Sequence, residues 1–330
     1  MATATLGRER DEERALKKPR ADWLLHNTAD YRQIGIIAAY WALMFLPIFV
    51  PWCRNFAFLV GACYFGFLNS VVIHNHLHKG IFKSKALNRA FRCVLSFGAL
   101  YPASANVASH NLVHHHFDDD GKPDWAAPEN VDFEWNLLNL IHFPNVVGTN
   151  TFSGVSRWAL TTRQQDFRRQ YLIEQVFAFG LTGALLCYDF WTALFFVVLP
   201  QLWGARGILR INLIQHDACD VTSEWNHSRN FVGRAFNWIM CNNGYHTIHH
   251  NRAALHWSVL DVVHEREVKP RIDPSLDEKS MVLYLLRTYV LNFRRPRTRD
   301  VRQAELALPK SDLAAVEERR AAAEADALLG

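Results

Sequence analysis

The sequence predicts an all-α integral membrane protein with four transmembrane helices in two hairpins and a cytoplasmic, histidine-rich helical cap. Three observations predict this fold: two long apolar blocks at residues 34–73 and 172–211, three histidine clusters with helical spacing, and Lys and Arg residues that gather outside the apolar blocks. The mean hydropathy of −0.08 hides these blocks, because very polar segments offset them.

The chain begins with a charged, Ala-rich segment in which Arg and Lys alternate with acidic residues. It has no apolar stretch followed by a cleavage site, so we expect no signal peptide. We predict a partly disordered cytoplasmic tail over residues 1–32, a membrane domain over residues 33–295, and a basic and then Ala/Glu-rich tail over residues 296–330.

The first apolar block, residues 34–73, is interrupted only around residues 51–55. About forty residues that rise 1.5 Å each cross a hydrocarbon core of about 30 Å twice. The second block breaks in the same way near Asp189. We therefore predict spans at about 34–51, 56–73, 172–188 and 191–211. The alternative is two buried hairpins of a soluble protein, but the blocks are long and apolar for core helices.

Basic residues orient this array. The short turns between the spans carry only Arg54, whereas the ends of the chain and the long polar segments hold nearly all other Lys and Arg residues. By the positive-inside rule, both termini and the region between the hairpins face the cytoplasm. The net charge of +4 is small and its basic residues lie at the two ends, which suits an anionic lipid surface better than nucleic acid.

The remaining apolar stretches are too short to cross a membrane. Residues 93–108 contain Gly, Pro and Asn, and we interpret them as an interfacial or re-entrant segment. Residues 133–143 and 281–293 have the pattern of amphipathic helices that either lie in the interface or pack onto the cytoplasmic cap. The Arg-rich run at residues 294–299 suits anionic headgroups. The six cysteines form no C-x-x-C pair and are expected to be buried free thiols.

Histidines recur at helical spacing in three places, with an Asn and a His at i,i+4 in a fourth. On a helix, residues four apart share a face, so two or three imidazoles of one cluster are able to converge on one ion. Imidazole binds iron, zinc, copper and nickel, so one cluster does not identify the metal. With the predicted topology all four sets emerge on the cytoplasmic side: His74/His78, His110/His114/His115, Asn212/His216 and His246/His249/His250.

These H-x-x-x-H, H-x-x-x-H-H, N-x-x-x-H and H-x-x-H-H boxes, placed around two apolar hairpins, resemble the membrane fatty acid desaturase and hydroxylase superfamily over about residues 34–257. The resemblance implies a desaturase-like catalytic domain over residues 33–295 with two iron ions on its cytoplasmic side. Such a centre uses O₂ and two electrons to attack an unactivated C–H bond of an acyl chain. Nine ligands are implied: His74, His78, His110, His114, His115, His216, His246, His249 and His250.

The resemblance also implies partners. Asn212 matches the position that holds a metal-bound water in acyl-CoA desaturases. No His-Pro-Gly-Gly stretch of a fused cytochrome b5 domain is present, so we expect electrons from a separate ferredoxin, rubredoxin or cytochrome b5-like protein. The substrate is expected to be a membrane lipid or acyl thioester. We expect desaturation, with hydroxylation as the alternative because the H-x-x-x-H-H spacing is closer to branches that include alkane hydroxylases.

Other polar residues near the boxes are assigned outer roles. His76 lies opposite His74 and His78 on a helix, so we expect it behind the ligands or in solvent. Carboxylates able to orient the imidazoles are Asp118, Asp119, Asp120, Asp124, Asp217 and Asp220, with Asp217 favoured because it follows His216. Ordinary surface or core positions are expected for His26, His142, His227, His256 and His264.

Two other classes of protein also use histidine clusters. A zinc-dependent membrane hydrolase needs fewer ligands, no O₂ and no electron donor. A metal transporter or sensor needs ionisable residues within its spans, and these spans hold almost none beyond Glu174 and Arg206 near their ends.

Overall fold

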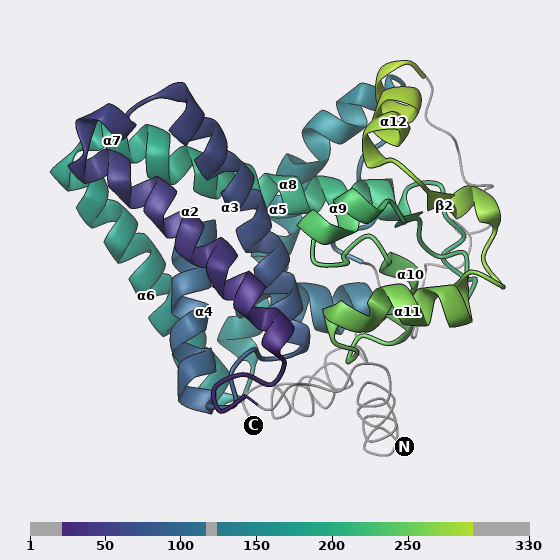
Figure 1. Cartoon of the computed structure of the whole chain (residues 1–330), viewed down its shortest axis with the longest axis horizontal. Coiled ribbons are helices and arrows are strands. Elements are labelled where there is room, and N and C mark those ends of the chain that lie inside the picture. The colour runs from purple at the N-terminus through teal and green to yellow at the C-terminus, as the bar shows by residue number, and fades with distance from the viewer. Residues whose placement is uncertain (1–21, 117–123, 293–330) are drawn as a thin grey trace. The chain divides into compact units, whose positions relative to one another are not determined.

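The computed structural model describes residues 22–116 and 124–292. The chain divides into two compact units (Figure 1). The first, called here the apolar-helix unit, comprises Pro19–Ala108 and Val155–Ile208. The second, the histidine unit, comprises Ser109–Gly154 and the described residues from Leu209 to Asn292. The described part is mostly helical, as predicted, and four of its helices are long and apolar enough to cross a membrane.

The first hairpin contains α2 (Tyr31–Phe49), preceded by the short helix η1 (Thr28–Asp30), and α3 (Phe56–His78). A 3-10 turn at Pro51–Cys53 separates them, and the Asn55 side chain accepts a hydrogen bond from the Phe58 amide to begin α3. α3 continues five residues past the predicted end of its span. Because of this extension, His74 and His78 lie in the last turns of the helix itself.

The second hairpin contains α6 (Gln165–Tyr188), α7 (Phe190–Ala193), the π-helical η7 (Leu194–Val198) and α8 (Leu199–His216). Asp189 ends α6 and caps α7. Its carboxylate also lies 3.1 Å from the Arg54 guanidinium. This ion pair joins the turns of the two hairpins at one end of the unit, so α3 carries His74 and His78 at its far end.

Close backbone contact joins α3 to α8. A Cβ atom on Gly204 would lie 2.2 Å from the Gly66 carbonyl oxygen, so a larger residue cannot replace this glycine without separating the helices. The core of the unit adds side chains from α2, the helix α4 (Lys85–Ala99) and the second hairpin: Tyr40, Met44, Ile48, Phe97, Leu185, Ala193 and Val197.

Several predicted boundaries differ from the structure. Residues 22–32, which the sequence places in a tail, are folded: Leu25 is buried and forms an antiparallel bridge with Phe82. A helix predicted over residues 133–143 is instead α5 (Asn136–Thr161), which continues through Pro144. All six cysteines are free, as predicted, but only Cys53, Cys219 and Cys241 are buried. Cys63 and Cys93 are half-buried, and Cys187 is exposed. The Arg-rich run at 294–299, residues 1–21 of the predicted N-terminal tail and the predicted C-terminal tail at 296–330 lie outside the described residues.

The histidine unit is built from shorter elements. They are the π-helical η3 (Val107–Val113), η4 (His114–His116), η6 (Pro128–Asn130), the start of α5, the end of α8, α9 (Arg234–Ile239), α10 (His246–Asn251), η8 (Trp257–Val259), α11 (Leu260–Val263), η9 (His264–Val268), η10 (Pro274–Leu276), α12 (Met281–Leu285) and η11 (Leu286–Val290). Two short strands modify the all-α prediction, since β1 (Asn230–Phe231) pairs in parallel with β2 (Asp277–Glu278).

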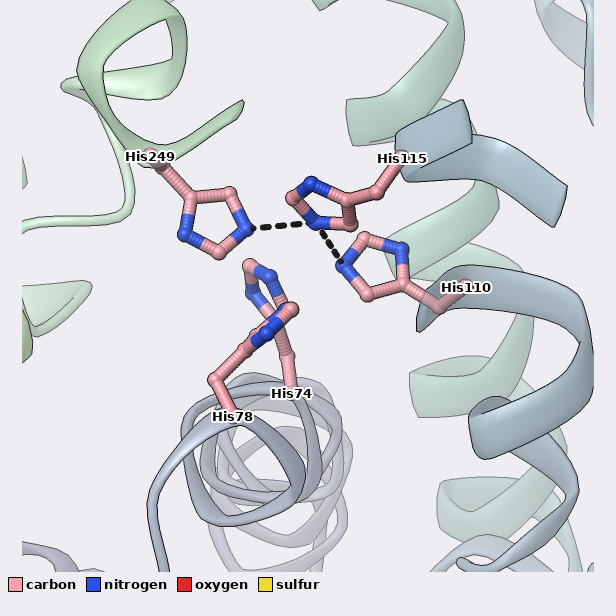
Figure 2. A group of neighbouring side chains, drawn as sticks. All are labelled: His74, His78, His110, His115 and His249. Carbon is pink, nitrogen blue, oxygen red and sulfur yellow. Dashed lines mark hydrogen bonds between the residues drawn. The ribbon is translucent and has the colours of Figure 1, made fainter. Parts of the chain in front are cut away.

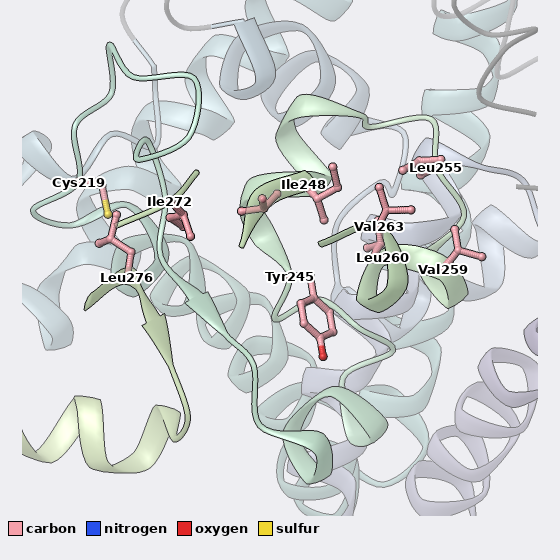
Figure 3. Packing of buried hydrophobic residues seen from close by; sticks show 10 residues of the cluster. Cys219, Tyr245, Ile248, Leu255, Val259, Leu260, Val263, Ile272 and Leu276 are labelled. Atoms are coloured by element: carbon pink, nitrogen blue, oxygen red, sulfur yellow. The ribbon is translucent and has the colours of Figure 1, made fainter. Parts of the chain in front are cut away.

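The core of the histidine unit lies beside α10 (Figure 3). It packs one side of α10 against α11 and η9, so the helix that carries three histidines has a fixed support. The buried residues are Cys219, Tyr245, Ile248, Leu255, Val259, Leu260, Val263, Val268, Ile272 and Leu276.

Candidate metal centre

Four histidines of the histidine unit form the first cluster. His114 comes from η4, His216 from the last turn of α8, and His246 and His250 from α10. One ring nitrogen of each lies within 4.8 Å of those of the other three. The Nε2 atoms of His216 and His246 are 2.8 Å apart, and those of His246 and His250 are 3.1 Å apart.

Three further histidines of this unit form the second cluster (Figure 2). Nε2 of His115 lies 3.1 Å from Nε2 of His110 and 3.1 Å from Nε2 of His249. The dashed lines in Figure 2 join these three side chains, which come from η3, η4 and α10. Residues from η3 and η4 and from the distant helix α10 therefore place their Nε2 atoms close together.

Neighbouring residues supply different clusters. His114 and His115 are consecutive, yet they belong to the first and second clusters respectively, and the same holds for His250 and His249. The rings of His115 and His250 stack at 4.3 Å between centroids. The i,i+4 spacing of His110 and His114 suggested that their rings belong to one cluster. The structure instead places them in different clusters. The chain passes from the π-helical η3 into the 3-10 helix η4 between these residues, and His110 meets His115 instead.

The first histidine box belongs to the apolar-helix unit. His74 and His78 lie one turn apart on α3, as predicted, with ring centroids 5.1 Å apart (both are labelled in Figure 2). His76 is buried and its ring packs against Phe91, so it does not face solvent. The Ile81 amide donates to its Nδ1 at 3.4 Å.

Hydrogen bonds on the far side of two rings orient the first cluster. His114 Nδ1 lies 2.8 Å from the Asp124 carboxylate, and His216 Nδ1 lies 3.2 Å from the His227 carbonyl oxygen. An N–H at Nδ1 leaves the Nε2 lone pair directed at the cluster. The Asp124 carboxylate is therefore placed where it is able to orient the His114 ring. His227 acts through its backbone, which no side-chain pattern reveals.

Two further predicted carboxylates, Asp217 and Asp220, also form hydrogen bonds. Asp217 accepts a hydrogen bond from the Tyr289 hydroxyl at 2.7 Å. Asp220 accepts from the backbone and hydroxyl of Thr222 in a local turn. Asp118, Asp119 and Asp120 and the side chain of His116 lie outside the described residues. Asn212, one turn before His216 on α8, donates to the Ala126 carbonyl at 2.9 Å, close to Asp124 in the chain.

Burial keeps His250 in the form that binds metal. Burial, followed by the nearby rings of His115 and His246, lowers the pKa of His250 well below its ordinary value. The ring is neutral at physiological pH, and its lone pair is available.

The donor set fits a metal ion. Two nitrogens that bind one ion at about 2.1 Å with about 90° between them lie about 3.0 Å apart. The observed Nε2 separations of 2.8–3.1 Å match this value. An all-imidazole set suits iron, zinc, copper or nickel. Each cluster in the histidine unit is therefore able to bind a metal ion, and the geometry alone does not select which.

Comparison with protein families identifies the pattern. Residues 49–279 match the family model described as fatty acid desaturase. The matched stretch covers well over half of the chain and includes every histidine box. Neither the curated proteins nor the solved structures give a match.

Proposed function

Because the chain belongs to the fatty acid desaturase family, a family of O₂-dependent oxidoreductases, we propose that it desaturates a fatty acyl chain of a lipid or thioester with two iron ions, O₂ and two electrons. The four long apolar helices agree with a membrane protein that meets such a substrate in the bilayer.

One observation carries the choice of a dinuclear site: consecutive histidines enter different clusters. Since His114 and His115 are adjacent in the chain, as are His249 and His250, ions bound to the two clusters would be close neighbours. A hydrolase with a single zinc needs three protein ligands and an open position. It gives no reason for seven histidines in two clusters of the histidine unit.

The ligand assignment extends the two clusters. We assign His114, His216, His246 and His250 to one iron, and His110, His115 and His249, completed by His74 and His78, to the other. The i,i+4 placement of His74 and His78 on α3 supports the assignment, as does the match of their box to the family pattern. Asn212, one turn before His216, is the proposed holder of a water on the four-histidine iron.

When bound, the two irons would supply the redox chemistry that removes hydrogen from an unactivated C–H bond. The described residues provide the scaffold for it. Asp124 and the His227 carbonyl hold the Nδ1 protons of His114 and His216, and burial keeps His250 neutral. A rigid, neutral ligand set places positive charge at the ions, where O₂ and electrons arrive.

The partners follow from the same proposal. The family implies a lipid substrate and an electron donor; we propose a separate ferredoxin, rubredoxin or cytochrome b5-like protein. The site is proposed on the cytoplasmic side. The paired turns at Arg54 and Asp189 support this, because they carry little positive charge and lie at the end of the unit away from His74 and His78.

Mass spectrometry of total lipids tests the activity. A host that supplies an electron donor expresses the chain, its His249→Ala variant, or the control His142→Ala, a histidine outside both clusters in the histidine unit. We expect acyl species that have lost two hydrogens with the intact chain and the control only. A gain of one oxygen would instead identify a hydroxylase. Identical lipids in all hosts would contradict an acyl substrate.

A further inference from the structure

A short apolar helix of the histidine unit has two different faces. It comprises α12 and η11, Met281–Val290. Tyr284, Thr288 and Tyr289 are buried against the unit. The opposite side, called here the outer face, is exposed and mostly aliphatic, with Val282, Leu283, Leu286, Val290 and Leu291 beside one cation, Arg287, which pairs with Glu278. Leu283 is 66% exposed and Leu291 is 73% exposed, so the unit itself does not cover this face.

The π-turn of η11 creates this separation. In a straight α-helix of about 100° per residue, Tyr289 would return almost to the side of Val282. The wider turn over Leu286–Val290 rotates Tyr289 into the protein and keeps Val290 on the outer face. The local backbone therefore concentrates the aliphatic residues on one exposed side.

The start of α5 contacts the buried side of this helix. Asn136 at its first turn donates a 2.8 Å hydrogen bond to the Thr288 carbonyl. Phe133 and Trp135, just before α5, and Ile141 on α5 are also exposed. Exposed aromatic residues are typical of segments at the boundary between lipid and water.

Length and charge select the partner. Ten residues rise about 15 Å, half of a hydrocarbon core, so this helix cannot cross a bilayer. Basic residues flank it in the sequence, with the exposed Lys279 before it and Arg294, Arg295, Arg297 and Arg299 after it. A short helix with an apolar face and flanking cations fits a bilayer surface that contains anionic lipids.

We infer that Met281–Leu291 is an interfacial anchor, whose outer face inserts among the lipids of the membrane in which the four long helices reside, and whose flanking cations bind anionic headgroups. The inference rests on membrane residence of those helices, but not on the iron chemistry. A soluble protein partner or another segment of the chain are the competing occupants of the outer face.

Site-specific photocrosslinking tests the anchor. The full chain carries a benzophenone amino acid at Leu283, at Val176 or at Glu265, in nanodiscs of equal parts phosphatidylcholine and phosphatidylglycerol. Val176 is an exposed residue of α6 and reports membrane residence, whereas Glu265 is an exposed polar residue of the histidine unit. Mass spectrometry then identifies the adducts. We expect lipid adducts at positions 283 and 176 and none at position 265.

Adducts at 176 without adducts at 283 would overturn the anchor while leaving membrane residence intact. A crosslink from 283 to a peptide of this chain or to another protein would also overturn it. A second arm replaces Arg294, Arg295, Arg297 and Arg299 by Gln. The share of phosphatidylglycerol among the adducts at 283 should fall to its share in the nanodisc, and an unchanged excess would overturn the role of these cations.

Discussion

The Tyr289 hydroxyl of η11 donates a 2.7 Å hydrogen bond to Oδ2 of Asp217. This bond connects η11 to the end of α8, where His216 lies. Arg229 reinforces the same place, since its guanidinium donates to the carbonyls of Ile214 and Asp217. Burial and the adjacent Asp217 raise the pKa of Tyr289 well above its ordinary value. The phenol therefore remains a donor throughout the physiological range.

Tyr289→Phe removes this donor and leaves a buried carboxylate with one partner fewer. We expect a loss of about 1–3 kcal/mol in the free energy of unfolding and weaker retention of the metal at the His216 cluster. Thermal unfolding in detergent and metal analysis after mild chelation measure the two effects. The control Tyr188→Phe alters an exposed tyrosine. Equal effects in both variants would contradict a stabilising role of the Tyr289–Asp217 hydrogen bond.

Asp124→Asn tests the orientation of His114. The substitution removes the charge that holds the Nδ1 proton at 2.8 Å, and loss of such an outer partner typically lowers metal affinity about 10–100-fold. Competition with a chelator measures the affinity. Asp132→Asn, at an exposed residue of the same unit, is the control. Unchanged affinity in Asp124→Asn would show that this carboxylate does not orient the ligand.

Glu174 anchors the segment that precedes η3. It is fully buried on α6 and accepts hydrogen bonds from the Ser104 amide and hydroxyl at 2.8 and 2.6 Å. The buried Arg92 lies 3.7 Å away. Glu174→Ala leaves that cation without its counter-charge, so we expect a loss of about 3–5 kcal/mol in stability. Asp166→Ala, at the exposed start of α6, should cost less than about 1 kcal/mol. Similar thermal unfolding of both variants would contradict this stabilising role of Glu174.

Cys219 should resist alkylation. Burial raises its pKa to about 12, only partly offset by Arg229, so very little thiolate exists at mildly alkaline pH. Maleimide mapping should label exposed Cys187 in the folded protein and Cys219 only after denaturation in SDS. Because the unfolded thiol ionises near 9.0 and the folded thiol only near 12, stability should fall as the pH rises between these values. Rapid labelling of folded Cys219 would contradict its burial.

The sequence predicted what depends on local pattern. Apolar length revealed the four long helices, and i,i+4 spacing placed His74 and His78 on one side of α3. It did not predict how the histidines divide between the clusters, because regular helical spacing does not describe the change from the π-helical η3 to the 3-10 helix η4. The His227 carbonyl and Tyr289 were missed for another reason. A backbone atom leaves no side-chain signature, and Tyr289 reaches Asp217 only through the tertiary fold.

The order in residues 22–32 is a similar case, since local pattern does not predict it. Leu25 is buried by its bridge to Phe82, a long-range contact that composition does not encode. The composition of the segment was polar, and a polar segment by itself predicts disorder.

Metal analysis of the purified full-length protein tests the central claim most directly. Two histidine clusters with neighbouring ligands predict about two irons per chain. His249→Ala should lower this content, and His142→Ala should leave it unchanged. A single zinc per chain, unaffected by His249→Ala, would contradict the dinuclear iron centre and with it the proposed desaturase chemistry.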